Sequence, residues 1–188
     1  MIIGRDPERQ TLSDLLLKEE SQFCVVYGRR RVGKTYLIRE TFNYNFTFQH
    51  TGMAKTSKSG QLIAFRDSLR ACGLTGCNTP KTWIDAFNQL KQLIEQAPSG
   101  KKVIFIDELP WMDTAKSGMV SALENFWNGW AARRTDIVMI ATGSASSWMV
   151  ENIEENQGGL HNRLKCKLKL KQFTLHETEQ YLQRKGCK

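Results

Sequence analysis

Residues 28–35 read Gly28-Arg29-Arg30-Arg31-Val32-Gly33-Lys34-Thr35. Two glycines with four residues between them, followed by Lys-Thr, are typical of a phosphate-binding loop. Glycine adopts backbone angles that other residues avoid, so main-chain N–H groups can close around phosphate oxygens. We expect Lys34 to bind the β- and γ-phosphates and to act in catalysis through its charge, and Thr35 to offer a hydroxyl to Mg²⁺. The other six residues are expected to bind nucleotide mainly through their backbone, with the three arginine side chains facing outward.

The sequence around this loop predicts strands that alternate with helices. Strands are predicted at 23–27, 45–51, 102–107, 137–141 and 165–171. Helices are predicted at about 8–18, 34–41, 61–71, 82–96, 118–132 and 145–152. A last helix should follow Thr174, where Glu177 completes a capping box. This alternation predicts an α/β fold of three layers, a parallel sheet with helices on both faces.

A second signal is the apolar run 103–106, which ends in Asp107-Glu108. The last residues of a buried parallel strand lie at the carboxyl edge of the sheet, where open α/β sheets bind ligands. We expect Asp107 to hold Mg²⁺ through water and Glu108 to orient and deprotonate an attacking water. The alternative is that Asp107 and Glu108 are two solvated acids at a strand end with no role in catalysis. The phosphate-binding loop earlier in the sequence makes this alternative the weaker one.

Three further polar residues lie next to predicted strands. Thr142 and Ser144, after the strand at 137–141, could lie between the two acids and the γ-phosphate. Ser144 as a helix N-cap is an equally good interpretation, and both can hold. Arg163, before the last strand, could stabilise transition-state charge in its own molecule or in a neighbour. A surface salt bridge is the alternative for Arg163, and His161 is expected to be a loop residue.

The charge of the chain is unevenly distributed. Its net charge is +8, and residues 159–188 hold eight Lys or Arg against two Asp or Glu, a net of +6. Lys165, Lys167, Lys169 and Lys171 alternate with apolar residues, so they should share one side of a strand. Lysines of this kind commonly protect a sheet edge, which we favour over contact with nucleic acid.

The composition is ordinary for one globular domain of 188 residues. No segment approaches the roughly 20 apolar residues of a membrane span, and the N-terminus lacks the apolar centre of a secretory signal. Five cysteines are scattered without CxxC spacing. We therefore expect reduced thiols, a cytoplasmic location and no membrane partner.

Together these residues resemble the archaeal-type ATPase family, a branch of P-loop ATPases related to AAA+ and STAND proteins. The matching stretches are Ile3-Gly4-Arg5 with Glu8, the loop 28–35, Ile104 to Trp111, Thr142-Gly143-Ser144, and Gly159 to Arg163. The resemblance implies a five-stranded sheet of order 5-1-4-3-2. It also implies that Ile3, Gly4 and Arg5 lie near the adenine, and that ATP with Mg²⁺ is the ligand.

Family members usually continue into a helical lid and further C-terminal domains. We therefore expect residues 1–188 to form an ATPase core domain without them. The expected activity is Mg²⁺-dependent ATP hydrolysis. The alternative is a slow nucleotide-gated switch that binds a protein or nucleic-acid partner, and a homo-oligomer is possible under either hypothesis.

Overall fold

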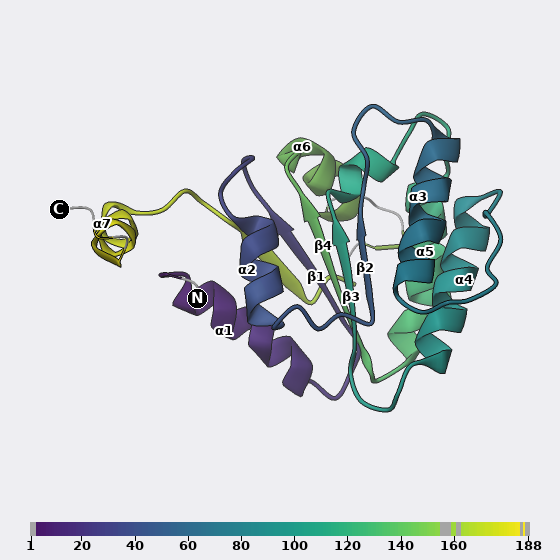
Figure 1. Cartoon of the computed structure of the whole chain (residues 1–188), viewed down its shortest axis with the longest axis horizontal. Helices are drawn as coiled ribbons and strands as arrows, with labels where there is room; N and C mark the ends of the chain where they lie inside the picture. The colour runs from purple at the N-terminus through teal and green to yellow at the C-terminus, as the bar shows by residue number, and fades with distance from the viewer. Residues whose placement is uncertain (1–2, 155–158, 161–162, 185, 187–188) are drawn as a thin grey trace.

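The computed structural model describes residues 3–154, 159–160, 163–184 and 186 (Figure 1). Five parallel strands form one sheet: β1 (Gln22–Tyr27), β2 (Phe48–Thr51), β3 (Lys102–Asp107), β4 (Ile137–Gly143) and β5 (Cys166–Lys169). Their order, β2-β3-β4-β1-β5, is the expected order 5-1-4-3-2 read from the opposite edge. The predicted α/β fold is confirmed.

Helices cover both faces of this sheet (Figure 1). One face carries α1 (Asp6–Asp14) and α2 (Lys34–Thr41), and the other carries α3 (Lys58–Ala71), α4 (Trp83–Gln96) and α5 (Met119–Gly129). The short α6 (Ser146–Met149) follows β4 and continues as the π-helical turn Val150–Glu154. Turns of 3-10 helix lie at Leu15–Leu17, Leu109–Met112 and Ala131–Arg133. None of the described helices has the length and apolar character needed to cross a membrane.

The last helix, α7 (Leu175–Arg184), stands apart from the sheet at the side where α1 lies (Figure 1). None of its described residues is buried. The predicted capping box is present, because the Glu177 carboxylate accepts from the Thr174 N–H at 2.7 Å and the Thr174 hydroxyl accepts from the Glu177 N–H at 3.2 Å. The capping box therefore determines where α7 begins, although the helix buries little apolar surface.

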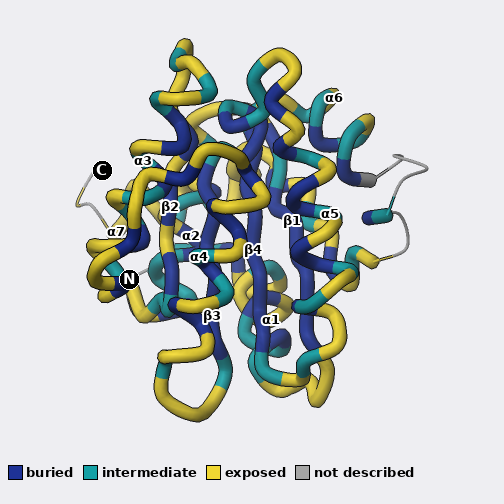
Figure 2. The backbone as a smooth tube through the Cα atoms, turned by 90° about the vertical axis from the view of Figure 1, so that its right-hand side faces the viewer, coloured by how far each residue is buried: buried dark blue, intermediate teal, exposed yellow. Residues whose placement is uncertain are grey.

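Alternation of side chains along β1 separates two cores. Phe23 and Val25 join the cluster packed under α3, α4 and α5, whereas Cys24 and Val26 join the cluster under α1 and α2. Figure 2 shows the central strands as dark blue traces enclosed by more exposed segments. A strand buried on both faces needs a continuous apolar run, which is why β1, β3 and β4 were recognisable in the sequence.

Several predicted boundaries are wrong by a few residues. β2 begins at Phe48 and not at 45, because positive φ angles at Asn43 and Tyr44 carry the chain out of α2 first. α3 begins at Lys58, because the Ser57 hydroxyl caps it by accepting from the Gly60 N–H at 3.2 Å. β5 ends at Lys169 and α5 at Gly129, both earlier than predicted.

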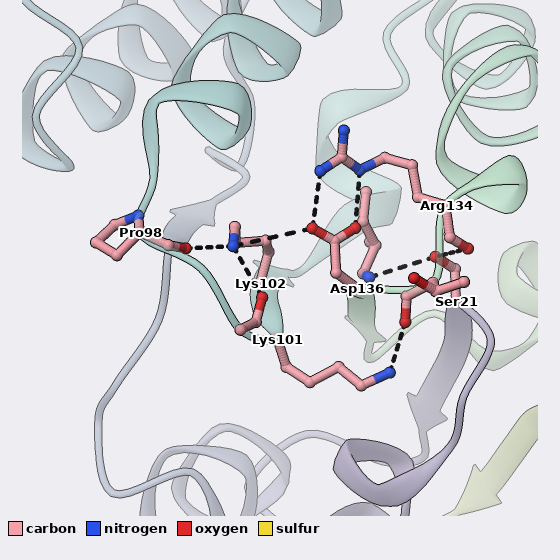
Figure 3. Close-up of polar contacts among 9 residues, drawn as sticks. Ser21, Pro98, Lys101, Lys102, Arg134 and Asp136 are labelled. Carbon is pink, nitrogen blue, oxygen red and sulfur yellow. Dashed lines mark hydrogen bonds and ion pairs between the residues drawn. The ribbon is translucent and has the colours of Figure 1, made fainter.

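The amino-terminal edge of the sheet is closed by a polar cluster (Figure 3). Arg134 donates two hydrogen bonds to the Asp136 carboxylate, at 2.8 and 2.7 Å, and these lower the pKa of Asp136. The nearly buried Lys102 binds two main-chain oxygens of the preceding turn and lies 3.8 Å from Asp136. The Ser21 hydroxyl donates to the Arg134 main-chain oxygen at 2.7 Å. This cluster joins the starts of β1, β3 and β4.

Candidate functional site

The loop between β1 and α2 requires both of its glycines, for different reasons. Gly28 has φ 147°, and a Cβ atom there would lie 2.2 Å from the main-chain oxygen of Leu170. Gly33, with φ 91°, lies directly before α2 in the left-handed region that glycine tolerates best. The end of β5 therefore presses against the first glycine, while the second turns the chain into the helix.

Lys34 is folded back into this loop. Its Nζ donates to the main-chain oxygens of Gly28 and Arg29 at 3.0 and 3.1 Å, and to the Ser144 hydroxyl at 3.1 Å. Burial lowers the pKa of Lys34, while the nearby carboxylates of Glu108 and Asp107 oppose that effect. The side chains of Arg29, Arg30 and Arg31 are exposed, as predicted.

Thr35 and Asp107, the two predicted Mg²⁺ ligands, lie in direct contact. The Thr35 hydroxyl is 2.9 and 3.1 Å from the two carboxylate oxygens of Asp107. Thr142 is completely buried and donates its own hydroxyl proton to the same carboxylate. The Thr142 oxygen also accepts from the main-chain N–H of Glu108 at 3.0 Å. One hydroxyl at the end of β4 thus connects both acids at the end of β3.

Glu108 is held by a second hydroxyl from the same strand end. Its φ is 51°, in a region that is costly for a residue with a side chain. The Ser144 N–H donates to Glu108 Oε2 at 3.1 Å, and the Ser144 hydroxyl donates to Oε1. Gly52 supports the same turn, because its N–H donates to the Asp107 main-chain oxygen at 2.9 Å. A Cβ at Gly52 would lie 2.5 Å from the Glu108 main-chain oxygen.

Ser144 is not the N-cap of the following helix, so that expectation is wrong. The N-cap of α6 is Ala145, without a side-chain hydrogen bond. The Ser144 hydroxyl is instead placed between Lys34 and Glu108. The position before it is crowded, because a Cβ at Gly143 would lie 2.7 Å from Met149 and 2.9 Å from Pro110.

A cavity of about 980 Å³ lies beside the loop. Ile3 and Arg5, which the family resemblance places near the adenine, line it together with loop residues 29–33. Gly4 lies between them, and a Cβ there would be 2.9 Å from the Glu177 side chain. The Arg5 guanidinium is nearly buried and binds Glu8 at 3.3 Å.

Part of the lining of this cavity comes from the C-terminal segment and was missed by sequence reasoning. Phe173 and Tyr181 line the cavity, with ring centroids 6.3 Å apart. The Arg5 guanidinium lies 4.8 Å from the Phe173 ring centroid and 3.9 Å from Glu177. In the sequence, the only sign of this lining is the pair of aromatic residues on either side of the capping box. Their role depends on contact with Arg5, which lies 168 positions before Phe173 and so could not be paired with it from the sequence.

Arg163 is exposed, and its main-chain N–H donates to Leu160 at 3.0 Å. Within the described ranges, its side chain makes no contact with Lys34, Asp107 or Glu108. Gly158, His161 and Asn162 lie outside the described residues, so the predicted loop role of His161 stays a prediction.

Known proteins resemble this chain over nearly all its length. Among curated proteins, "Uncharacterized protein MJECL04" of Methanocaldococcus jannaschii is 24% identical over 181 residues, which cover 96% of this chain and 38% of that protein. The chain thus spans about two fifths of the length of that relative. Among solved structures, the Walker-type ATPase PABY2304 of Pyrococcus abyssi has a TM-score of 0.68 at 18% identity, covering 97% of this chain and 57% of its own.

ORC2 of Aeropyrum pernix, solved as ADPNP and ADP complexes, has a TM-score of 0.66 at 17% identity and covers 98% of this chain and 52% of its own. ORC1 of the same organism, solved with DNA, has a TM-score of 0.63 at 14% identity, covering 99% and 50%. At these identities the likeness shows a shared fold. The sequence profile described as an ATPase domain predominantly from Archaea matches residues 3–188. The chain therefore belongs to this family of ATPase domains.

Proposed function

We propose that this chain binds Mg²⁺-ATP and hydrolyses it. The observation that carries the proposal is one continuous hydrogen-bond network at the carboxyl edge of the sheet, which joins Lys34, Thr35, Asp107 and Glu108 through the hydroxyls at the end of β4. The cavity of about 980 Å³ beside the loop has room for a nucleotide. Phosphoryl transfer depends mainly on positioning and charge, which this network supplies.

The donor set at Thr35 and Asp107 fits Mg²⁺. Mg²⁺ prefers oxygen ligands, keeps several waters, and commonly takes only one or two protein side chains besides phosphate oxygens. The hydroxyl and the carboxylate already lie 2.9 Å apart, so both can face one site. When bound, the ion would neutralise charge on the β- and γ-phosphates.

Lys34 would bind phosphate by exchanging partners. Its ammonium group now contacts two main-chain oxygens of its own loop, which are weaker partners than phosphate. A triphosphate in the loop would therefore draw Nζ outward. That movement would also release the Ser144 hydroxyl from its contact with Lys34.

Glu108 would act as the base for the attacking water. Both of its carboxylate oxygens accept hydrogen bonds from Ser144. The Ser144 hydroxyl contacts both Lys34 and Glu108, so a movement of Lys34 toward bound phosphate would change the hydrogen bonding of Glu108. Thr142 keeps the backbone of Glu108 and the side chain of Asp107 in fixed relation. Arg163 would add charge stabilisation, in its own molecule or in a neighbour.

The test compares Mg²⁺-ATP binding and turnover among three variants. Lys34→Ala should lower nucleotide affinity by about 10- to 100-fold, since it removes charged hydrogen bonds to phosphate. Glu108→Gln should retain binding and lose about 100-fold or more of turnover, as expected for a lost general base. Glu19→Gln, on an exposed residue, is the matched control and should behave as wild type. Equal turnover of wild type and Glu108→Gln contradicts the assignment of the base.

The second candidate is a slow switch that binds nucleic acid, and the exposed lysines in and next to β5 favour it. Lys165, Lys167, Lys169 and Lys171 are all exposed beside a free edge of the sheet. Within the part of the chain that the structure describes, Lys165 is the one of the four in an ion pair, with Glu20 at 3.2 Å. The related fold of ORC1 was solved with DNA.

Fluorescence anisotropy with labelled DNA and RNA over a salt series distinguishes this candidate from edge protection. Contact with several phosphates gives an affinity that falls steeply with salt, and replacing the four lysines by glutamine should flatten that slope. A control variant carries the same change at Lys55, Lys58, Lys81 and Lys91, which lie in or next to α3 and α4. If both variants keep the wild-type slope, edge protection is the better account of the lysines.

A further inference from the structure

Two cysteines lie side by side on adjacent strands of the sheet. Cys24 of β1 and Cys166 of β5 are paired in register in adjacent parallel strands. Both side chains belong to the core cluster under α1 and α2, so they project from the same face of the sheet. Adjacent strands lie roughly 4.8 Å apart, within the roughly 4.4–6.8 Å of Cα separation that a disulfide spans.

The two thiols differ in chemical character. Burial raises the pKa of the Cys24 thiol. A hydrogen bond from Cys24 lowers the pKa of Cys166, which makes Cys166 the better thiolate of the pair. Lys165 and Lys167 flank Cys166 in the sequence and line the same surface opening as Cys166. The pair thus combines a thiolate-prone cysteine with a protonated neighbour.

Access from solvent also differs between them. An opening of about 380 Å³ between α1 and β5 is lined by Cys166 together with Leu15, Lys18 and Lys165. Cys166 is 7% exposed, whereas Cys24 is completely buried. A small reagent can therefore approach Cys166 from outside, and Cys24 can react only with its partner.

We propose that Cys166 and Cys24 form a modification site for small hydroperoxides, with Cys166 as the attacking thiolate and Cys24 as the resolving thiol. In the first step the Cys166 sulfur attacks the peroxide, the O–O bond breaks, and Cys166 becomes a sulfenic acid while the departing alkoxide or hydroxide takes a proton from water. In the second step the Cys24 sulfur attacks the sulfenic sulfur and water leaves. The peroxide is reduced and the two thiols are oxidised to one disulfide between β1 and β5.

The experiment follows thiols and mass in the folded protein. In a variant with Cys72, Cys77 and Cys187 replaced by alanine, hydrogen peroxide should consume both remaining thiols and lower the mass by about 2 Da, the loss of two hydrogens. A thiol reductant should reverse the change. In the wild-type chain, a proteolytic map should contain one cross-linked peptide that joins Cys24 and Cys166, which tests the proposal even if the triple variant does not fold.

Single variants separate the two roles. With Cys24→Ala, oxidation should stop at a sulfenic acid on Cys166, a gain of about 16 Da that a cyclic diketone traps. With Cys166→Ala, Cys24 should stay reduced under the same peroxide. The proposal is overturned if both cysteines remain thiols in the native protein while Cys72 oxidises. It is equally overturned if the cross-link forms only after unfolding in urea.

Discussion

Replacing Thr142 by valine tests whether one hydroxyl holds the two acids together. Valine keeps the shape of the side chain in a position that is completely buried, so the change removes the hydrogen bonds with little change in packing volume. The hydroxyl now donates to Asp107 and accepts from the Glu108 N–H at 3.0 Å. The Glu108 N–H and the Asp107 carboxylate would each lose a hydrogen-bond partner at a completely buried position.

The size of the effect follows from these two contacts. Leaving the main-chain N–H without a partner costs about 1–3 kcal/mol, and removing a hydrogen bond to a carboxylate costs about 1.5–3 kcal/mol. The added methyl group returns about 0.8 kcal/mol through burial. We expect Thr142→Val to lower the free energy of unfolding by about 2–5 kcal/mol. We also expect turnover to fall more than affinity, because Glu108 loses its backbone anchor.

Urea unfolding of wild type, Thr142→Val and Thr142→Ser measures this directly. Serine keeps the hydroxyl and loses only a methyl group, so it should cost about 1 kcal/mol and retain most of the turnover. If valine unfolds within about 0.5 kcal/mol of wild type, or serine is the worse of the two, the hydroxyl does not connect the acids as described.

Three other outcomes can be measured with the same methods. Gly28→Ala should lower both the melting temperature and nucleotide affinity, since its Cβ would overlap the Leu170 oxygen at 2.2 Å; unchanged affinity would contradict the close approach. Burial lowers the pKa of His50 from 6.5 to about 4. Stability should therefore be complete above pH 6.5 and fall by up to about 3 kcal/mol as pH drops toward 4. His50→Gln should flatten that slope, and an equal slope in both proteins would exclude His50 as its source. Asp136→Asn should cost about 1–3 kcal/mol of unfolding free energy and leave turnover unchanged, because it leaves Arg134 without its carboxylate far from the loop.

Much of the fold was predictable because its signals are local. β1 is a continuous apolar run followed at once by the loop and α2, so the residues that specify the turn are neighbours in the chain. Asp107 and Glu108 were recognisable for the same reason, as two acids at the end of an apolar run. The family resemblance supplied the strand order, which periodicity alone does not reveal.

What the sequence did not reveal depends on contacts between distant segments. The role of Ser144 was open because its two side-chain partners, Lys34 and Glu108, lie in segments far from it in the sequence. The cavity wall formed by Phe173 was missed because its partner, Arg5, lies at the other end of the described chain. The pairing of Cys24 with Cys166 likewise exists only once β5 lies beside β1.

The polar cluster around Asp136 has a consequence for how this domain can change. It lies where the strands begin, whereas the hydrogen-bond network that joins Lys34, Asp107 and Glu108 lies where they end, and an apolar core separates the two. The polar cluster and the proposed nucleotide site thus lie at opposite ends of the strands. We therefore expect substitutions around Asp136 to change thermal stability without changing turnover. This end of the sheet is the rational place to stabilise the protein for biochemical work.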